Sequence, residues 1–311
     1  MVLKNVNYFG QATNRTQIRE NIIWYLRDSF INAGGYYNIA SGTLGFDGTD
    51  VSLLQPSHHP DKGKFQVWKG LSHEWVWETG INATYAGGAS PALVSGVYIE
   101  DVFYPTGTTG TYAFDVDYGK GAIVFKNKSF ASGTKIWAER SERAAFVYPA
   151  ESNEYRQIIY EHERVFNDPP GSGQDTFGSN LKAFLPAVFV DVSHGRNKAY
   201  QIGSNSHIKT FGITMEVFSE DLRQFDFLRD ACIGLETQSF TMYDSNTVQS
   251  SGAYPLRYDG TLSPTPQQFS GLVDLYPWKN GSFGDLVVER KVNSPLPLQI
   301  ASIKLEFEII G

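Results

Sequence analysis

Apolar and polar residues alternate strictly near the C-terminal end of the sequence. In this stretch Ala301, Ile303, Leu305, Phe307 and Ile309 alternate with Ser302, Lys304, Glu306 and Glu308. Successive side chains of a β-strand point to opposite faces of its sheet. The alternation therefore predicts a strand over residues 301–309, with one face in a core and the other toward solvent.

Further elements are predicted upstream of this strand. An apolar run from residue 185 and a second one over residues 207–218 indicate strands, and residues 238–243 indicate another. Between them, residues 219–234 carry apolar side chains at helical spacing. Ser219 is expected to cap this helix, Glu220 and Asp221 to lie in its first turn, and Gly234 to end it. The pattern predicts an α+β sheet domain with one packed helix.

A long amphipathic helix is predicted over residues 14–33. Ile18, Ile22, Leu26 and Phe30 recur at every fourth position and form one broad apolar face. Asn14 and Gln17 have the spacing of a capping box, and the glycine pair at 34–35 is a typical helix end. The apolar face is expected either to pack in a core or to dock on a neighbouring subunit.

The middle of the chain is predicted to be rich in β-hairpins. Residues 93–125 alternate short apolar runs with turn-forming glycines, which indicates a hairpin meander that either packs on a core or projects as an arm. Residues 42–63 are typical of a loop, 65–79 of a strand pair or an irregular segment, and 135–140 of one more strand. Residues 150–166 are expected to be extended, and 250–277 to be irregular.

A domain boundary is predicted at residues 167–178. This stretch concentrates Asp, Pro, Gly and Ser, a composition typical of linkers. The chain of 311 residues is long enough for two domains. We therefore expect a β-rich domain over residues 1–166, with the helix 14–33 and the hairpin arm 93–125, followed by an α+β domain over residues 179–311.

The net charge and the cysteine content argue against some classes of function and indicate the compartment in which the protein is made. The formal net charge is -7, which argues against a protein that grips nucleic acid through its phosphates. The only cysteine, Cys232, lies on the apolar side of a predicted helix and is expected to be a buried apolar residue in a protein made in a reducing compartment. No apolar run reaches the ~20 residues that cross a membrane, and the N-terminus lacks the features of a secretory signal.

Few residues suggest chemistry. His58 and His59 are adjacent in a loop, but no third metal ligand is apparent, and Glu161 and Glu163 are expected to face away from His162 on a strand. Neither a Gly-x-Ser-x-Gly elbow nor a phosphate-binding loop is present. The sequence thus predicts no enzyme, with no catalytic, cofactor-binding or metal-binding residues and no cofactor, although a site assembled from scattered residues stays open.

Two acidic residues and three tryptophans allow alternative interpretations. Asp115 and Asp117 lie on one strand face, about 7 Å apart by strand rise, a separation found in inverting glycosidases. A solvated strand face is the simpler interpretation. Trp68, Trp75 and Trp77 could form a sugar-binding platform, but core packing or a subunit contact is the more common use of such residues.

Several segments resemble virion proteins of tailed bacteriophages. The segment 186–192 (PAVFVDV), the strand 208–218, the helix 219–234 and the strand 239–243 resemble the element order of tail-terminator proteins. Uncharacterised phage virion proteins are similar at other places, which together cover most of the chain: 24–38 (WYLRDSFINAGGYYN), 75–78 (WVWE), 104–112 (YPTGTTGTY), 254–260 (YPLRYDG), 276–278 (YPW) and 303–310.

This resemblance implies a structural protein that forms a ring, as a hexamer, at the neck or tail of a virion. The tail terminator or a head-tail connector component is the first expectation. A baseplate, tail-tube-associated or decoration protein is the second, and a carbohydrate-binding adhesin module is an alternative of another class. The expected partners are further copies of the chain and neighbouring neck, tail-tube or sheath proteins. DNA would pass through the lumen without specific binding, and the protein would be made in the host cytoplasm.

Overall fold

The computed structural model has the predicted α+β class. It describes residues 6–45, 48–57, 62–63, 65–70, 74–81, 90–152, 184–193, 195–199, 207–236, 238–291 and 298–310. The chain forms two compact units. One, here called the sheet unit, comprises Met1–Arg27, Ala145–Val248 and Phe269–Gly311. The other, the hairpin unit, comprises Asp28–Ala144 and Gln249–Gln268.

These units divide the chain differently from the predicted domains 1–166 and 179–311. The first strand of the sheet unit follows directly after residue 144, and the first part of the long N-terminal helix belongs to the sheet unit as well. An excursion between two late elements of the sheet unit belongs to the hairpin unit. The predicted linker 167–178 lies outside the described residues.

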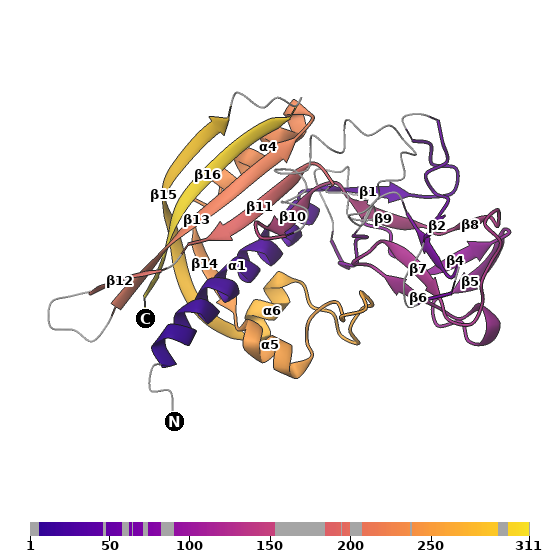
Figure 1. Cartoon of the computed structure of the whole chain (residues 1–311), viewed down its shortest axis with the longest axis horizontal. Coiled ribbons are helices and arrows are strands. Elements are labelled where there is room, and N and C mark those ends of the chain that lie inside the picture. The colour runs from indigo at the N-terminus through magenta and orange to yellow at the C-terminus, as the bar shows by residue number, and fades with distance from the viewer. Residues whose placement is uncertain are drawn as a thin grey trace. The chain divides into compact units, whose positions relative to one another are not determined.

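The sheet unit is built on a seven-stranded sheet (Figure 1). The strand order is β10-β11-β13-β16-β15-β14, and β12 also pairs with β13. Only the pair β10 and β11 is parallel among the described strand pairs. The strands are β10 (Phe146–Pro149), β11 (Ala187–Val192), β12 (Arg196–Ala199), β13 (His207–Ser219), β14 (Ser239–Tyr243), β15 (Pro277–Lys291) and β16 (Gln299–Ile310).

The alternation that predicted the last strand is confirmed in β16. Its odd residues from 301 to 309 are almost fully buried, whereas Lys304 and Glu306 are exposed. β13 pairs with β16 in antiparallel register over its whole length, so that Met215 lies opposite Ile303 and Ile213 opposite Leu305. Residues directly opposite each other share a face of the sheet. One face is therefore a continuous apolar layer. The other carries polar side chains along much of its length and, at the end formed by β10 and β11, the buried cluster of Phe146, Phe189 and Phe218.

Helix α4 (Leu222–Ile233) packs against β13 and β16 through Phe225, Leu228 and Cys232. The prediction that Ser219 caps this helix was wrong. Asp221 is the N-cap, because its carboxylate accepts hydrogen bonds from the amides of Arg223 and Gln224, both at 2.9 Å. Gly234 ends the helix as predicted.

Three elements fall where the sequence indicated little regular structure. α5 (Ser245–Ser251) and α6 (Phe269–Leu275) are about two turns long, and β15 is the longest of the described strands. β15 contains Gly281 because the ring of Phe307 lies where a Cβ at this position would be. A bulge between Gly284 and Val287, with Asp285 at a φ of 49°, interrupts its pairing with β16. The bulge also shifts the side-chain alternation.

The N-terminal helix α1 (Val6–Asn32) is longer than predicted. It begins before Asn14, so the predicted capping box at Asn14 and Gln17 is wrong. Gly34, at a φ of 89°, follows its last turn, as the glycine pair indicated. The core-packing interpretation of its apolar face is confirmed, since four side chains are at most 1% exposed: Ile18, Ile22, Leu26 and Phe30.

In the sheet unit, α1 forms hydrogen bonds to β14 and β10, the strands at the two ends of the sheet. Asn21 accepts a hydrogen bond from the amide of Tyr243 in β14 (2.8 Å) and donates to the carbonyl of the same residue (3.1 Å). Toward the other end, Arg27 donates to the carbonyl of Val147 in β10 (3.3 Å) and Arg15 to that of Val192 in β11. The polar edges of β10 and β14 thus find partners on one helix.

The hairpin unit contains three small antiparallel sheets. The predicted meander over residues 93–125 is confirmed, but it is not a free arm, because β7 pairs with β3 and β4 pairs with β8. The sheets are β1 (Tyr36–Ile39) with β9 (Arg140–Arg143); β2 (Gln55–Ser57), β3 (Val67–Lys69), β7 (Ala122–Phe125) and β6 (Phe114–Asp117); and β5 (Val102–Pro105), β4 (Gly96–Ile99) and β8 (Ile136–Trp137).

Local features of this unit follow the sequence. The β4–β5 hairpin turns at Glu100 and Asp101, whose φ values of 48° and 67° fit a two-residue turn. Residues 42–63 and 65–79 hold only β2, β3 and isolated bridges where they are described. Residues 150–152 are a turn and a bend instead of the predicted extended strand, and residues 153–166 lie outside the described residues.

Candidate functional site

The polar face of the large sheet is the first candidate for a functional surface. Strand register places carboxylates of four strands on this side. Glu216 and Glu289 both lie opposite Ser302, and Glu306 is on the same side of β16 as Ser302, four residues further along. We call it the acidic face, and it carries Asp191, Glu216, Glu289, Glu306 and Glu308. Lys304 is the cation in its middle and binds both carboxylate oxygens of Glu289 at 2.9 Å.

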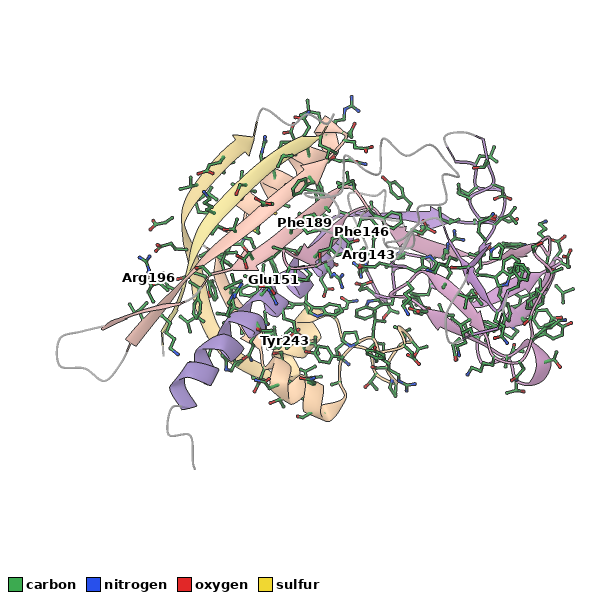
Figure 2. All side chains as sticks on the ribbon, viewed as in Figure 1. Arg143, Phe146, Glu151, Phe189, Arg196 and Tyr243 are labelled. Atoms are coloured by element: carbon green, nitrogen blue, oxygen red, sulfur yellow. The ribbon has the colours of Figure 1, made fainter. Side chains whose placement is uncertain are left out.

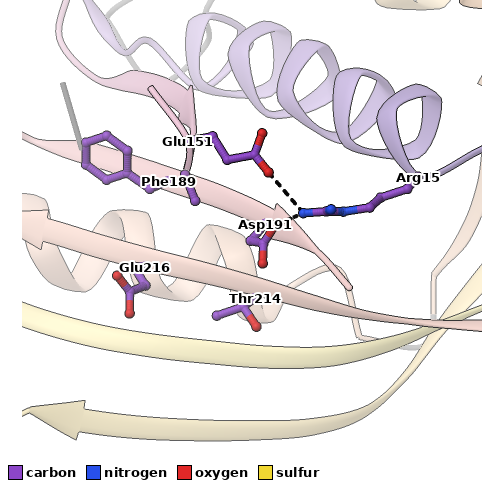
Figure 3. A pocket seen from close by; sticks show the side chains of 7 residues that line it. Arg15, Glu151, Phe189, Asp191, Thr214 and Glu216 are labelled. Atoms are coloured by element: carbon purple, nitrogen blue, oxygen red, sulfur yellow. Dashed lines mark hydrogen bonds and ion pairs between the residues drawn. The ribbon is translucent and has the colours of Figure 1, made fainter. Parts of the chain in front are cut away.

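A pocket of about 350 Å³ lies at the corner of the acidic face, beside α1 (Figure 3). Arg15 points from α1 toward Glu151 and Asp191, with nitrogen–oxygen distances of 3.1 and 3.0 Å. Arg19 binds the other oxygen of Glu151 at 3.0 Å. The lining residues are Arg15, Ala150, Glu151, Phe189, Asp191, Thr214 and Glu216.

The electrostatics of this pocket favour a structural role. The hydrogen bond and charge of Arg19, followed by the charge of Arg15, lower the pKa of Glu151, so it stays ionised. Arg15 also bonds the carbonyl of Val192 at the end of β11. Thr214 is the one hydroxyl among the described lining residues, and none of these is a histidine or a cysteine that could activate it. The ion pairs therefore fasten α1 to the sheet and leave an acidic surface.

Asp115 and Asp117 of β6 differ in exposure and in their partners. Asp115 is partly exposed and pairs with Lys126 at 2.8 Å. Asp117 is only 4% exposed and accepts a hydrogen bond from the amide of Lys120 at 2.9 Å. Burial raises the pKa of Asp117, while the bond from Lys120 and its charge oppose the rise. The prediction of a solvated strand face was thus wrong for Asp117.

Asp117→Asn is expected to raise the free energy of unfolding at pH 7. A carboxyl whose folded pKa is raised binds its proton more tightly in the folded state, so its contribution to stability falls as the pH rises through that pKa. Asparagine keeps an oxygen for the Lys120 amide and carries no charge to desolvate. Urea unfolding at pH 7 and near pH 4 should show a gain at pH 7 that shrinks in acid.

Asp115→Asn is the matched control for this prediction. Asp115 lies on the same strand, but its carboxylate faces solvent and forms a surface pair, so its loss should change stability by less than about 1 kcal/mol. An Asp117→Asn variant that is less stable than the native chain at pH 7 would mean that the Lys120 and Lys69 charges outweigh the burial of the carboxylate.

The three tryptophans form no exposed platform. Trp68, Trp75 and Trp77 are at most 2% exposed, so the core interpretation is confirmed and the sugar-binding platform is ruled out for these rings. Cys232 is completely buried in α4, and burial raises the pKa of its thiol to about 12. It is the buried apolar residue that the sequence indicated.

The remaining candidates are not brought together. His58, His59, Glu161, His162 and Glu163 lie outside the described residues. Within the described part of the chain, no group of three or more His, Cys, Asp or Glu side chains is arranged to hold a metal ion. The same part contains no helix that is both long and apolar enough to cross a membrane.

Sequence reasoning missed a buried ionic network in the hairpin unit. Arg143 and Glu78 form an ion pair, and both side chains are almost inaccessible to solvent. The carboxylates of Glu78, then Glu74, outweigh the effect of burial and raise the pKa of Arg143. Arg140, also buried, binds Glu142 at 2.8 Å and donates to backbone carbonyls of Val51 and Ser52.

The charged groups of this network bind one another and backbone carbonyls, which indicates a structural role. Each guanidinium faces carboxylates or carbonyls at hydrogen-bond distance, and Gly70 is a glycine because a Cβ there would lie 2.6 Å from Glu142 and 3.0 Å from Arg140. The run Arg140-Ser-Glu-Arg143 has the composition of a solvated strand. Its partners lie far away in the sequence, so only the fold shows that it is buried.

No protein-family model matches this chain, and a search of curated proteins finds no match. Function is therefore inferred from the residues and their geometry.

Proposed function

We propose that this chain is a structural protein of a tailed-phage virion that assembles into a ring at the neck or tail end, as a tail terminator or head-tail connector component. DNA passes through the ring without sequence-specific binding. In this proposal the chain holds no cofactor and catalyses no reaction. Its partners are further copies of itself and the adjoining neck, tail-tube or sheath proteins.

The acidic face is the observation that carries the proposal. It spreads over β11, β13, β16 and β15 of one continuous sheet, where Asp191, Glu216, Glu289, Glu306 and Glu308 share a side with the described cations Lys304 and Arg196. A surface of this charge repels DNA phosphates and gives a passing duplex no place to bind. A sheet is also a rigid scaffold, because its paired backbone groups fix the face to which each side chain points. The net charge of -7 agrees with this role.

Other virion positions remain the second candidate. A baseplate, tail-tube-associated or decoration protein would use the same rigid sheet, and location in the particle separates these options. The adhesin alternative was based on Trp68, Trp75 and Trp77, whose burial removes that support. Phe103 in β5 is 43% exposed, but one exposed ring does not define a binding site.

The test is to locate the chain in intact particles. A short tag after residue 311, visualised by gold-labelled antibody in negative-stain images of virions, is expected at the junction of head and tail. The purified protein is expected to give ring-shaped particles with a mass of several copies of 34.7 kDa by mass photometry. A tag placed on a fibre protein of the same phage controls for non-specific labelling.

Label at the baseplate or along the tail would replace the neck assignment by the second candidate. Absence of the chain from purified virions, or label only at fibre tips, would contradict the proposal.

A further inference from the structure

The sheet unit has two backbone edges that α1 does not cover. β14 pairs with β15 only as far as Ser282, so the rest of β15, to Lys291, is paired on one side by β16 and on the other by no described strand. β12 likewise pairs with β13 on one side only in the described part of the chain. β12 lies on the β11 side of β13, whereas β15 lies beyond β16 on the other side. Free strand edges are templates for pairing with another chain.

The directions of these two edges match without turning a subunit over. β13 and β15 are both antiparallel to β16 and therefore run in the same direction. β12 is antiparallel to β13. If a second copy follows the first side by side in the same orientation, its β12 meets β15 of the first copy in antiparallel alignment. Such a head-to-tail contact repeats from copy to copy and closes into a ring when its rotation divides a full turn.

The side chains along the two edges are complementary. Arg196, labelled in Figure 2, is exposed. It lies opposite Thr210, which places it on the polar side of the sheet. Glu289 lies on the same side, opposite Ser302. An antiparallel register that places Arg196 of one copy opposite Glu289 of the next therefore joins opposite charges on one face. Lys304 already binds Glu289, and a carboxylate has lone pairs for a second cation.

Apolar surface at the same edge supports the same contact. Val287 and Val288 are 51% and 41% exposed, and they are adjacent in the free part of β15. In the register with Arg196 opposite Glu289, both valines lie within the paired segment, one on each face of the sheet. Natural sheets avoid strand edges that are both unpaired and apolar, because such edges pair with other chains. An edge of this kind therefore indicates a partner that covers it.

We propose that β15 of one copy pairs with β12 of the next, with Glu289 opposite Arg196, so that the large sheet continues from subunit to subunit. The occupant of the free β15 edge is thus a second copy of this chain. This inference rests on the proposed ring and names the surfaces that form it.

Cysteine cross-linking between two populations of the chain tests the register. One population carries Arg196→Cys and the other Glu289→Cys. Both positions are on the surface, and the native Cys232 is buried. Directly opposed residues have Cβ atoms about 5 Å apart, within reach of a short bifunctional thiol reagent. The mixed sample is expected to give a dimer band on a denaturing gel, whereas either variant alone gives none.

Val288→Cys mixed with Arg196→Cys is the matched control, because residue 288 points to the other face of the sheet. The control pair is expected to lose the dimer band. Equal bands from both pairs, or no band from the Glu289→Cys pair, would overturn the proposed register.

The outcomes also separate this inference from the proposed function. Rings at the virion neck without the expected cross-link leave the function in place and overturn the β12–β15 contact. A specific cross-link in a protein that is absent from virions establishes the contact and overturns the neck assignment.

Discussion

Replacing Arg143 with Met is expected to lower the free energy of unfolding by about 3–5 kcal/mol. Arg143 is 5% exposed and pairs with Glu78, which is completely buried. Without the guanidinium, the Glu78 carboxylate keeps its amide donor from Trp77, at 3.0 Å, but loses its counter-charge. An uncompensated buried charge is among the most destabilising changes that a single substitution can produce.

The pH dependence of this loss identifies its cause. In the Arg143→Met variant, the Glu78 carboxylate is buried without a counter-charge, and protonation removes that charge. The variant is therefore expected to regain stability in acid and to lose it again as the pH rises. Urea unfolding followed by tryptophan fluorescence reports on this region, because Trp75 and Trp77 are buried in the same unit.

Two further variants control the experiment. The double variant Arg143→Met with Glu78→Gln removes the charge and keeps an oxygen for the Trp77 amide, so it should recover most of the lost stability. Arg229→Met removes a guanidinium on the surface of α4 that pairs with Asp226 and Asp230, and it should cost less than about 1 kcal/mol. If Arg143→Met costs no more than Arg229→Met, the Glu78 ion pair does not stabilise the unit.

The sequence predicted those elements whose pattern is regular over many residues. β16 was found because its alternation runs without a break from Ala301 to Ile309, and α1 because its apolar residues recur over four turns. β15 was missed for a physical reason. The bulge after Gly284 shifts its side-chain phase, and its free edge leaves Val287 and Val288 exposed, so no single period spans the strand.

Two other features were not predicted: which of several neighbouring residues caps α4, and which distant residue pairs with Arg143. Ser219, Glu220 and Asp221 are all suitable near a helix start, and only the bonds to the amides of Arg223 and Gln224 identify Asp221 as the cap. The buried ion pair of Arg143 depends on a residue 65 positions away. A pattern of local polarity cannot distinguish such a pair from two solvated charges.

The acidic face was partly predictable. The polar positions of β16, including Glu306, were assigned to one side of the strand from the alternation alone. That Glu216 and Glu289 join them depends on the registers of β13 and β15, which are set by turns and a bulge. The pocket at Arg15 could not be predicted from the sequence, because its residues come from α1, from the segment after β10 and from the sheet.

Asn21→Leu is expected to lower the free energy of unfolding by about 1–3 kcal/mol for each backbone group that it leaves unpaired. Asn21 is completely buried and bonds both the amide and the carbonyl of Tyr243 in β14. Leucine has a similar size and a higher helix propensity, so α1 itself should gain slightly. The loss would therefore come from the junction between the helix and the strand. Urea unfolding measures it, and amide hydrogen exchange at Tyr243 should become faster.

Asn32→Leu provides the matched comparison. Asn32 lies in the same helix and donates a hydrogen bond to the carbonyl of Asp28, just as Asn21 donates to that of Gln17, both at 2.9 Å. The side chain of Asn32 is exposed, however, and within the described residues it forms no hydrogen bond to a strand. Its replacement should change stability by less than about 0.5 kcal/mol. Equal effects of the two variants would show that the helix interior is responsible. A large loss confined to Asn21 would mean that its two bonds to Tyr243 hold α1 on the β14 edge of the sheet.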